Sequence, residues 1–129
     1  MTTKSLDPAR DGEPVEPQSE TRPWGHYQIL HEEKGIKVKR IEVKPHARLS
    51  LQKHSRRAEK WTVIAGSGIV TLGTKDIHVK KGSFIDIPVG EIHRMHNTGE
   101  EPLAFVEVQF GDYLGEDDIV RLEDDFGRK

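Results

Sequence analysis

The chain has 129 residues, which is room for one domain with one modest core. Its 20 basic and 22 acidic residues give a formal net charge of -2, so the sequence offers no basic surface for nucleic acid or anionic lipid. It contains no cysteine, which excludes disulfides, zinc ribbons and thiol nucleophiles and leaves His, carboxylate and amide groups as possible metal ligands.

The N-terminal segment lacks the features of a leader or an anchor. No apolar stretch follows positive charge at the start, and no segment approaches the ~18 apolar residues of a spanning helix. Residues 1–21 carry three prolines, seven charged side chains and no aromatic residue, a composition that cannot bury enough apolar surface to become ordered. We therefore expect a cytoplasmic protein without nucleic-acid or membrane partners, with a disordered arm over residues 1–21 and a folded domain over residues 22–129.

Short β-rich runs separated by turn formers make up most of the folded domain, which begins near Arg22. The runs end in glycine- and proline-rich turns, for example at residues 66–68 and 88–90. Eight strands are predicted, at residues 35–43, 49–53, 59–65, 68–72, 75–79, 83–87, 93–96 and 103–110. Eight short strands with tight turns predict an all-β fold, a closed or nearly closed double sheet of the jelly-roll type.

Residues 112–125 form an acidic tail, in which seven of the fourteen residues are Asp or Glu. The carboxylates lack the Asp-x-Asp-x-Asp-Gly spacing of a calcium-binding loop. We expect the tail to form either a short helical turn or an extended acidic flap over the mouth of the barrel.

Four polar side chains have the spacing of a metal site. Gln52 and His54 are separated by one position, so alternation along a strand directs both to the same face. Glu59 opens the next strand, where a hairpin brings its carboxylate back toward His54, and His93 arrives from a distant strand. Such ligands suit zinc, manganese, iron, cobalt or nickel and leave positions open for water or substrate. Each residue alone is better explained as a polar group in a solvated turn, so the prediction rests on the four residues together.

The joint pattern resembles both halves of the cupin signature. The first half has the form Gly, five residues, His-x-His, three or four residues, Glu, six residues, Gly. The chain has Gln52, His54, Glu59 and Gly66 at these intervals, with His46 in place of the opening glycine and Gln52 in place of the first histidine. The second half is matched throughout by Gly82, Pro88, Gly90, His93 and Asn97.

Further segments carry a narrower resemblance. They are Arg22-Pro-Trp-Gly25, Val38-Lys-Arg-Ile41, Leu49-Ser-Leu-Gln52, Arg57-Ala-Glu59, Trp61, Tyr113-Leu-Gly-Glu-Asp-Asp-Ile-Val-Arg121 and Glu123-Asp-Asp-Phe-Gly-Arg128. Together they resemble the C-terminal domain of type II mannose-6-phosphate isomerase over about residues 22–128. That family favours glutamine at the position of Gln52 and often has histidine where this chain has Lys60.

The resemblance implies a single cupin barrel, or double-stranded β-helix, with one divalent metal ion. The ion, with zinc as first choice, would be held by Gln52, His54, Glu59 and His93. The implied reaction is the metal-dependent interconversion of mannose 6-phosphate and fructose 6-phosphate for nucleotide-sugar and polysaccharide synthesis. Glu59 is the expected general base, with His96 and Lys53 as alternatives.

A sugar phosphate also needs a cationic clamp, for which the planar guanidinium of arginine is well suited. Arg57, in the turn between two ligands, and Arg121 and Arg128, in the C-terminal stretch, are the expected substrate-binding residues. Arg128 is also expected in the catalytic set, on the run that could fold over the mouth. Solvated surface charges are the alternative for each.

Two other functions fit the same fold, because a fold by itself does not select a reaction. One is a non-catalytic cupin that binds a sugar or regulates a partner. The other is a dioxygenase that uses iron on the same ligands. We also expect a homodimer, since a barrel of this size gains stability by pairing.

Overall fold

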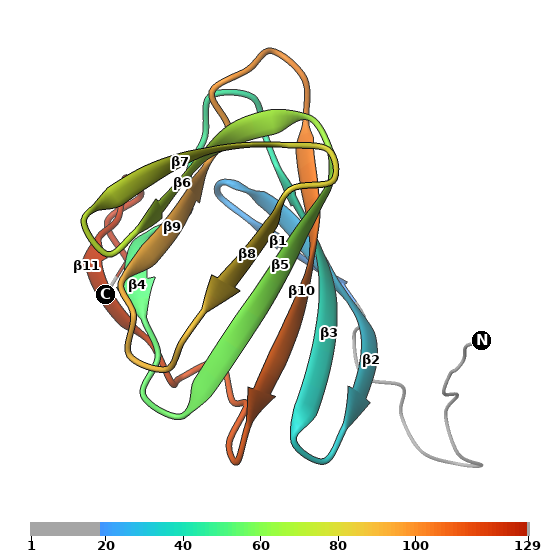
Figure 1. Cartoon of the computed structure of the whole chain (residues 1–129), viewed down its shortest axis with the longest axis vertical. Coiled ribbons are helices and arrows are strands. Elements are labelled where there is room, and N and C mark those ends of the chain that lie inside the picture. Colours follow the sequence, from blue (N-terminus) through green and yellow to red (C-terminus); the bar gives the residue numbers. More distant parts are fainter. Residues whose placement is uncertain (1–18, 129) are drawn as a thin grey trace.

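The computed structural model describes residues 19–128, and within that range it contains strands and turns but no helix (Figure 1). The eleven strands of this range are β1 (Ser19–Arg22), β2 (Gly25–Glu33), β3 (Ile36–Val43), β4 (Leu51–Lys53), β5 (Arg57–Ala65), β6 (Ser67–Leu72), β7 (Lys75–Lys80), β8 (Phe84–Ile87), β9 (His93–His96), β10 (Leu103–Gly111) and β11 (Val120–Glu123). The part of the chain that is described has no helix long and apolar enough to cross a membrane.

The strands form two antiparallel sheets. The larger has the order β1-β2-β3-β10-β5-β8, and the smaller has the order β11-β4-β9-β6-β7. From β3 onward the chain alternates between the two sheets except at the β6–β7 hairpin, which lies within the smaller sheet, as in a jelly roll. The all-β jelly-roll prediction is confirmed, and the eight predicted strands correspond to β3 through β10.

Three strands were not predicted. In β2 the pairing register with β3 shifts between Ile29 and His31, so the polar and apolar residues lose the alternation that identifies a half-buried strand. β1 and β11 are short edge strands whose side chains are mostly exposed, and an exposed strand lacks an apolar signal.

β1 also corrects the predicted arm. Its residues pair with β2 from Ser19 to Arg22, so residues 19–21, which were predicted to belong to the arm, are part of the large sheet. The pairing is held at its end by Tyr27, whose hydroxyl donates to Glu20 Oε2 at 3.0 Å and accepts from Arg22 Nη2 at 3.3 Å. The rest of the predicted arm, residues 1–18, lies outside the described residues.

The inward-facing residues of the large sheet change from apolar to polar along the strands. On β5 the apolar end has Val63 and the polar end has Glu59, with Trp61 between them. Neighbouring strands repeat this order in register, so Glu107 on β10 lies beside Trp61, and Lys39 on β3 lies beside Glu107. One end of the barrel is therefore filled by apolar side chains, and the other, the lower end in Figure 1, is lined by buried polar groups.

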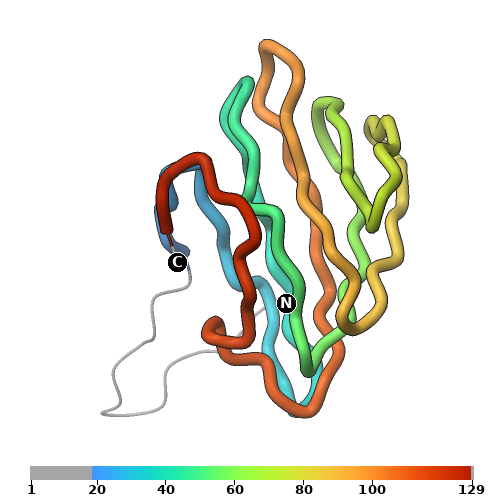
Figure 2. The backbone as a smooth tube through the Cα atoms, turned by 90° about the vertical axis from the view of Figure 1, so that its left-hand side faces the viewer, coloured from blue at the N-terminus to red at the C-terminus, as the bar shows by residue number. Residues whose placement is uncertain are grey.

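The C-terminal residues 112–128, here called the strap, return along the small sheet, where β11 pairs with β4 (Figure 2). The extended form of the tail is thus the one observed. The acidic composition has a structural reason, because each of the seven carboxylates has a partner. The pairs are Asp112 with Arg56, Glu116 with Lys39, Asp117 with Tyr113, Asp118 with the N–H groups of Ser55 and Arg56, Glu123 with Arg94, Asp124 with Arg128 and Asp125 with Arg48.

Candidate metal centre and adjoining cavity

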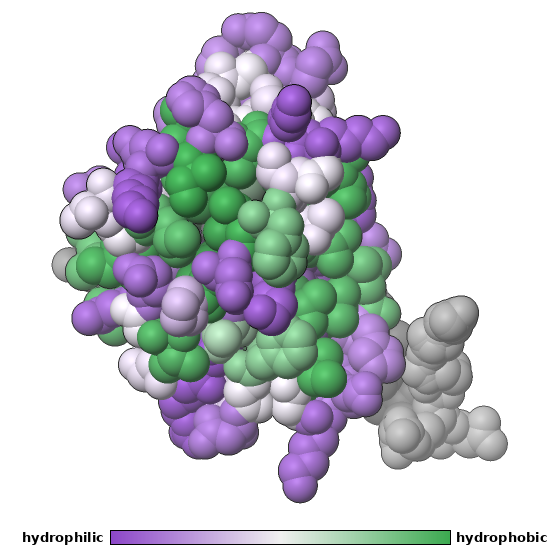
Figure 3. All heavy atoms as spheres, viewed as in Figure 1, coloured by the Kyte–Doolittle hydropathy of each residue, from purple (hydrophilic) through white to green (hydrophobic). Residues whose placement is uncertain are grey.

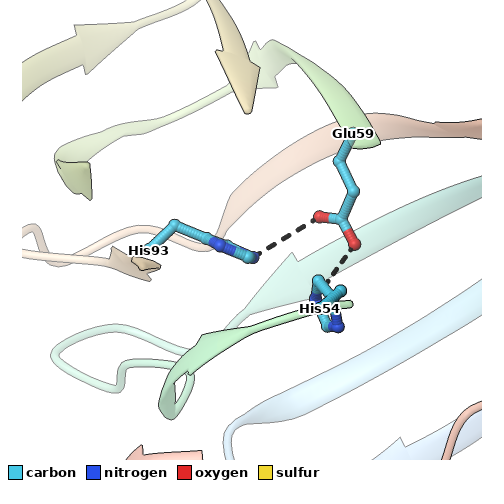
Figure 4. A group of neighbouring side chains, drawn as sticks. All are labelled: His54, Glu59 and His93. Carbon is cyan, nitrogen blue, oxygen red and sulfur yellow. Dashed lines mark ion pairs between the residues drawn. The ribbon is translucent and has the colours of Figure 1, made fainter. Parts of the chain in front are cut away.

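Three of the predicted ligands meet inside the barrel, each from a different segment (Figure 4). His54 follows β4, Glu59 lies on β5 and His93 begins β9. His54 Nε2 lies 3.2 Å from Glu59 Oε2, and His93 Nε2 lies 3.6 Å from Glu59 Oε1. One donor atom from each residue lies within 4.8 Å of the others, a spacing at which all three can contact one metal ion.

Backbone carbonyls orient both imidazoles toward this centre. His54 Nδ1 lies 2.6 Å from the carbonyl oxygen of Asp118, and His93 Nδ1 lies 2.8 Å from that of Glu91. A carbonyl can only accept, so each Nδ1 carries the proton and each Nε2 offers its lone pair to the centre. His93 Nε2 is buried and has no hydrogen-bond partner among residues 19–128, as expected of an atom that ligates a metal.

The protonation state of these rings also suits a metal. Burial, followed by the charge of Arg57, lowers the pKa of His54 to about 4. Burial likewise lowers the pKa of His93. Both rings are neutral near pH 7, and neutral imidazole is the form that binds a metal. The His54–Glu59–His93 cluster therefore fits a divalent cation.

Gln52, the fourth predicted ligand, lies next to the cluster. It pairs with His93 across β4 and β9, and directly opposed residues of antiparallel strands point to the same face. Its amide nitrogen donates to Ser50, at 3.2 Å to the carbonyl and 3.1 Å to the hydroxyl. Its role as a ligand stays a prediction.

Arg57 does not lie in the turn where it was expected. β5 begins at Arg57 rather than at Glu59, and alternation then directs both side chains inward. Arg57 is 6% exposed, and it donates from Nε to Glu59 Oε2 at 2.8 Å and from Nη2 to His54 Nε2 at 3.3 Å. The Arg57 guanidinium therefore contacts two of the three candidate metal ligands, His54 and Glu59.

A cavity adjoins the cluster and contains the other predicted arginines. Arg57, Arg121 and Arg128 all line it, together with Gln52. Arg121 is opposite Gln52 in the pairing of β11 with β4, and Arg128 is held by Asp124 through contacts of 2.8 and 3.0 Å. The structure thus brings the three predicted arginines to one cavity beside the candidate metal centre.

The sequence of the chain matches the model of a known family. A model of the family described as mannose-6-phosphate isomerase, C-terminal, matches residues 12–124. The chain belongs to this family.

Named relatives of this isomerase-domain family are polysaccharide-biosynthesis proteins and guanylyltransferases. The chain is 50% identical over 107 residues to xanthan biosynthesis protein XanB of Xanthomonas campestris pv. campestris (strain B100), covering 83% of this chain and 23% of XanB. Alginate biosynthesis protein AlgA of Pseudomonas aeruginosa is 49% identical, with 83% of this chain and 22% of AlgA covered. Mannose-1-phosphate guanylyltransferase of Klebsiella pneumoniae is 42% identical, again with 83% and 23% covered. The chain therefore spans less than a quarter of the length of these relatives.

Solved structures confirm the cupin fold. The capsular polysaccharide assembling protein CapF of Staphylococcus aureus superposes with a TM-score of 0.72 at 20% identity, over 85% of this chain and 33% of CapF. A Klebsiella pneumoniae protein with a double-stranded β-helix domain gives 0.69 at 21% identity over 95% and 99% of the two chains. The cupin domain of Schizosaccharomyces pombe Cnp3 gives 0.65 at 16% identity over 78% and 70%.

In this isomerase-family domain, Glu107 is a buried carboxyl that the sequence analysis missed. It is 4% exposed, and Trp61 Nε1 lies 3.0 Å from both Glu107 Oε1 and Glu59 Oε1. Burial first, and then the charge of Glu59, raise the pKa of Glu107 to about 7. Period-2 alternation places Glu107 on the same face as the apolar Phe105, and this inward charge was the available signal.

The two alternative bases do not join the cluster. His96 lies an odd number of positions from His93 on β9, and the charged groups near it, Arg48 and Arg94, belong to the opposite face. Lys53 follows Gln52 on β4 and points to the other side of that strand by alternation.

Proposed function

We propose that this domain catalyses the metal-dependent interconversion of mannose 6-phosphate and fructose 6-phosphate, in the supply of nucleotide sugars for polysaccharide synthesis. One observation carries the proposal: Arg57 contacts the His54–Glu59–His93 cluster and also lines the cavity with the other two predicted arginines. This arrangement supports a site for a metal ion next to a site for an anionic group. The family match supports mannose 6-phosphate as the sugar phosphate.

The reaction moves a proton between C2 and C1 of the sugar, and its barrier is the low acidity of a carbon next to a carbonyl. A divalent ion, with zinc as first choice, held by His54, Glu59, His93 and Gln52 would supply a Lewis acid that polarises this carbonyl. Glu59 is the proposed general base. Glu107, with a pKa of about 7, is a second carboxyl able to take up and return a proton near neutral pH.

The phosphate would be bound by guanidinium groups. Arg57, Arg121 and Arg128 present three cations to one cavity, and the planar fork of arginine matches phosphate oxygens. Arg57 would also position Glu59, because its Nε already donates to that carboxylate.

The proposal is tested by assaying the purified chain, with added zinc, manganese or cobalt, for conversion of mannose 6-phosphate to fructose 6-phosphate. Glu59→Gln should lower the rate by about 100-fold or more, the usual contribution of a general base. Lys60→Gln, on the same strand but paired outward with Asp86, is the matched control and should leave the rate within about 2-fold. Circular dichroism shows whether each variant folds. Absence of turnover with every metal would contradict the proposal.

A second function is favoured by the ligand set itself. Two histidines and one carboxylate with open positions form the set used by non-haem iron oxygenases. Oxygen uptake that requires ferrous ion would support this function, and binding of sugar phosphate without turnover would instead support a binding or regulatory cupin.

A further inference from the structure

One carboxylate of the strap occupies the polar end of the barrel. Glu116 Oε2 lies 2.7 Å from Lys39 Nζ and 3.7 Å from Lys37 Nζ, so a single oxygen contacts two ammonium groups. Lys37 also reaches Glu32 at 3.6 Å and the carbonyl of Leu114 at 3.0 Å. Lys39 and Glu116 both line the cavity that contains the three arginines.

The two partners of this ion pair differ in mobility. The Lys39 side chain is 5% exposed, and its Nζ lies 4.1 Å from the centre of the Tyr27 ring, so packing fixes it. The Glu116 side chain is 49% exposed and belongs to an irregular part of the strap between β10 and β11. Glu116 can therefore turn toward solvent, whereas Lys39 cannot.

The carboxylates that pair with Arg57 and Arg128 are less free to leave than Glu116. Glu59, the partner of Arg57, is 1% exposed. Asp124, the partner of Arg128, is 3% exposed and bound by both side-chain and backbone N–H groups of Arg128. Of the carboxylates that pair with Lys39, Arg57 and Arg128, Glu116 is therefore the one that can be exchanged for an incoming anion.

The size of the cavity indicates that such an exchange is needed. Its volume is about 110 Å³, below the roughly 300–1,000 Å³ of typical small-molecule sites. With Glu116 on Lys39 there is little room for a sugar phosphate. Removal of Glu116 alone, however, would leave a buried lysine charge unpaired, which is strongly unfavourable. An incoming anion that replaces Glu116 would make room in the cavity and would also keep the Lys39 charge paired.

We propose that Lys39, supported by Lys37, binds the phosphate group of the ligand, and that Glu116 holds this position until the phosphate displaces it. The inference rests on the proposed sugar-phosphate substrate. It adds a phosphate-binding residue on β3 and a role for the strap in opening the cavity. A phosphate dianion carries more charge than one carboxylate, so it satisfies the two ammonium groups better than Glu116 does.

Calorimetric titration of the full chain with inorganic phosphate tests this without any need for turnover. Lys39→Met should weaken phosphate binding at least about 10-fold, and Lys39→Arg, which keeps the charge, should restore most of it. Glu116→Gln should tighten binding about 3- to 10-fold, because the internal competitor is gone. The matched control is Arg40→Gln, since Arg40 follows Lys39 on β3 but pairs outward with Glu42, and it should bind phosphate as the unmodified chain does.

Equal phosphate affinity in Lys39→Met and the unmodified chain, or weaker binding in Glu116→Gln, would overturn the proposal. In the isomerase assay, Lys39→Met should raise KM for mannose 6-phosphate about 10-fold with kcat within about 3-fold. If turnover is absent while the calorimetric pattern holds, the proposed isomerase activity fails and the phosphate site stands. If turnover is present and the calorimetric pattern is absent, the proposed phosphate site fails and the isomerase activity stands.

Discussion

Two residues of the cupin signature shape the backbone rather than bind metal. His46, in the place of the usual opening glycine, has φ 65°, a left-handed conformation that glycine adopts without strain. Asn97 is fully buried, donates to the carbonyls of Val43 and Glu101 at 3.0 and 2.8 Å, and accepts from the N–H of Gly99 at 3.0 Å. Some positions of the signature are therefore explained by the turns that they form, and others by the candidate metal ligands.

His46→Gly should stabilise the protein. A non-glycine residue in the left-handed region costs about 1–2 kcal/mol, and part of this is offset by the greater freedom of glycine in the unfolded chain. The pair lost with Glu100 is exposed and contributes little. We expect a gain of about 1 kcal/mol in the free energy of unfolding, measured in urea. His46→Ala, which keeps the strained conformation, should show no gain; a gain equal to that of glycine would argue against strain at this position.

The buried histidines should make the metal-free protein sensitive to acid. The pKa of His54 is about 4 in the folded state and 6.5 for an ordinary histidine, so between these values the unfolded chain binds more protons than the folded one. The stabilising contribution is complete above about pH 6.5 and is lost as the pH falls toward 4, by up to about 3 kcal/mol.

Denaturation of chelator-treated protein across this pH range measures the effect. His54→Gln should flatten the pH dependence in part, since the pKa of His93 is also lowered by burial. Replacement of the exposed His78 by Gln should leave the slope unchanged. A free energy of unfolding that does not change between pH 7 and pH 5 would contradict the expectation.

At the scale of single elements, the strap connects stability to the candidate metal centre. The Asp118 carboxylate accepts from the N–H groups of Ser55 and Arg56, both at 2.9 Å, while its carbonyl accepts from His54 Nδ1. The strap therefore orients a candidate ligand, and it also brings Arg121 and Arg128 to the cavity. An acidic tail of this kind is a structural part of the site.

Asp118→Ala should weaken both properties. Loss of two hydrogen bonds to the carboxylate should reduce the free energy of unfolding by about 1–2 kcal/mol. A less fixed partner for His54 should weaken zinc binding about 10-fold, as measured by competition with a chromophoric chelator. Asp117→Ala is the neighbouring control, because its carboxylate contacts Tyr113 within the strap. Unchanged zinc affinity in Asp118→Ala would show that the strap does not orient the ligand.

At the scale of the whole molecule, the two faces of the large sheet differ in the side chains that they carry. The inner face carries the polar end that forms the candidate site. The outer face exposes Phe84 on β8, Ile64 on β5 and Phe110 on β10, at 57%, 37% and 38%. Figure 3 shows apolar side chains, in green, among hydrophilic ones over the strands of this sheet. Exposed apolar surface on a sheet is a common basis for association.

The predicted homodimer should therefore form through this outer face. Sedimentation velocity is expected to show a dimer, and Phe84→Lys should shift it toward the monomer, because a charge would be buried at the interface. Phe126→Lys changes another exposed aromatic residue, on the strap, and should leave the dimer intact. A monomer across the concentration range would contradict the homodimer prediction, and a dimer unaffected by Phe84→Lys would place the interface elsewhere.

Part of the candidate site was readable in the chain because its residues sit at fixed intervals. Gln52, His54 and Glu59 are close in sequence, and His93 belongs to a second motif of fixed spacing. Glu107 has no such motif, and it enters the site only because β10 pairs with β5 and places it beside Trp61. Glu116 belongs to the predicted acidic flap, but no local pattern indicates that its carboxylate contacts Lys39, 77 residues away in the chain.

The sequence by itself determined the all-β class, the positions of eight strands and three residues that meet as candidate metal ligands, because alternation, turn chemistry and motif spacing are local properties of the chain. The tertiary structure decided where the strap runs, which carboxylates are buried together and which cations line the cavity. These depend on pairing between distant strands and on the partners each charge finds, and no local pattern encodes either.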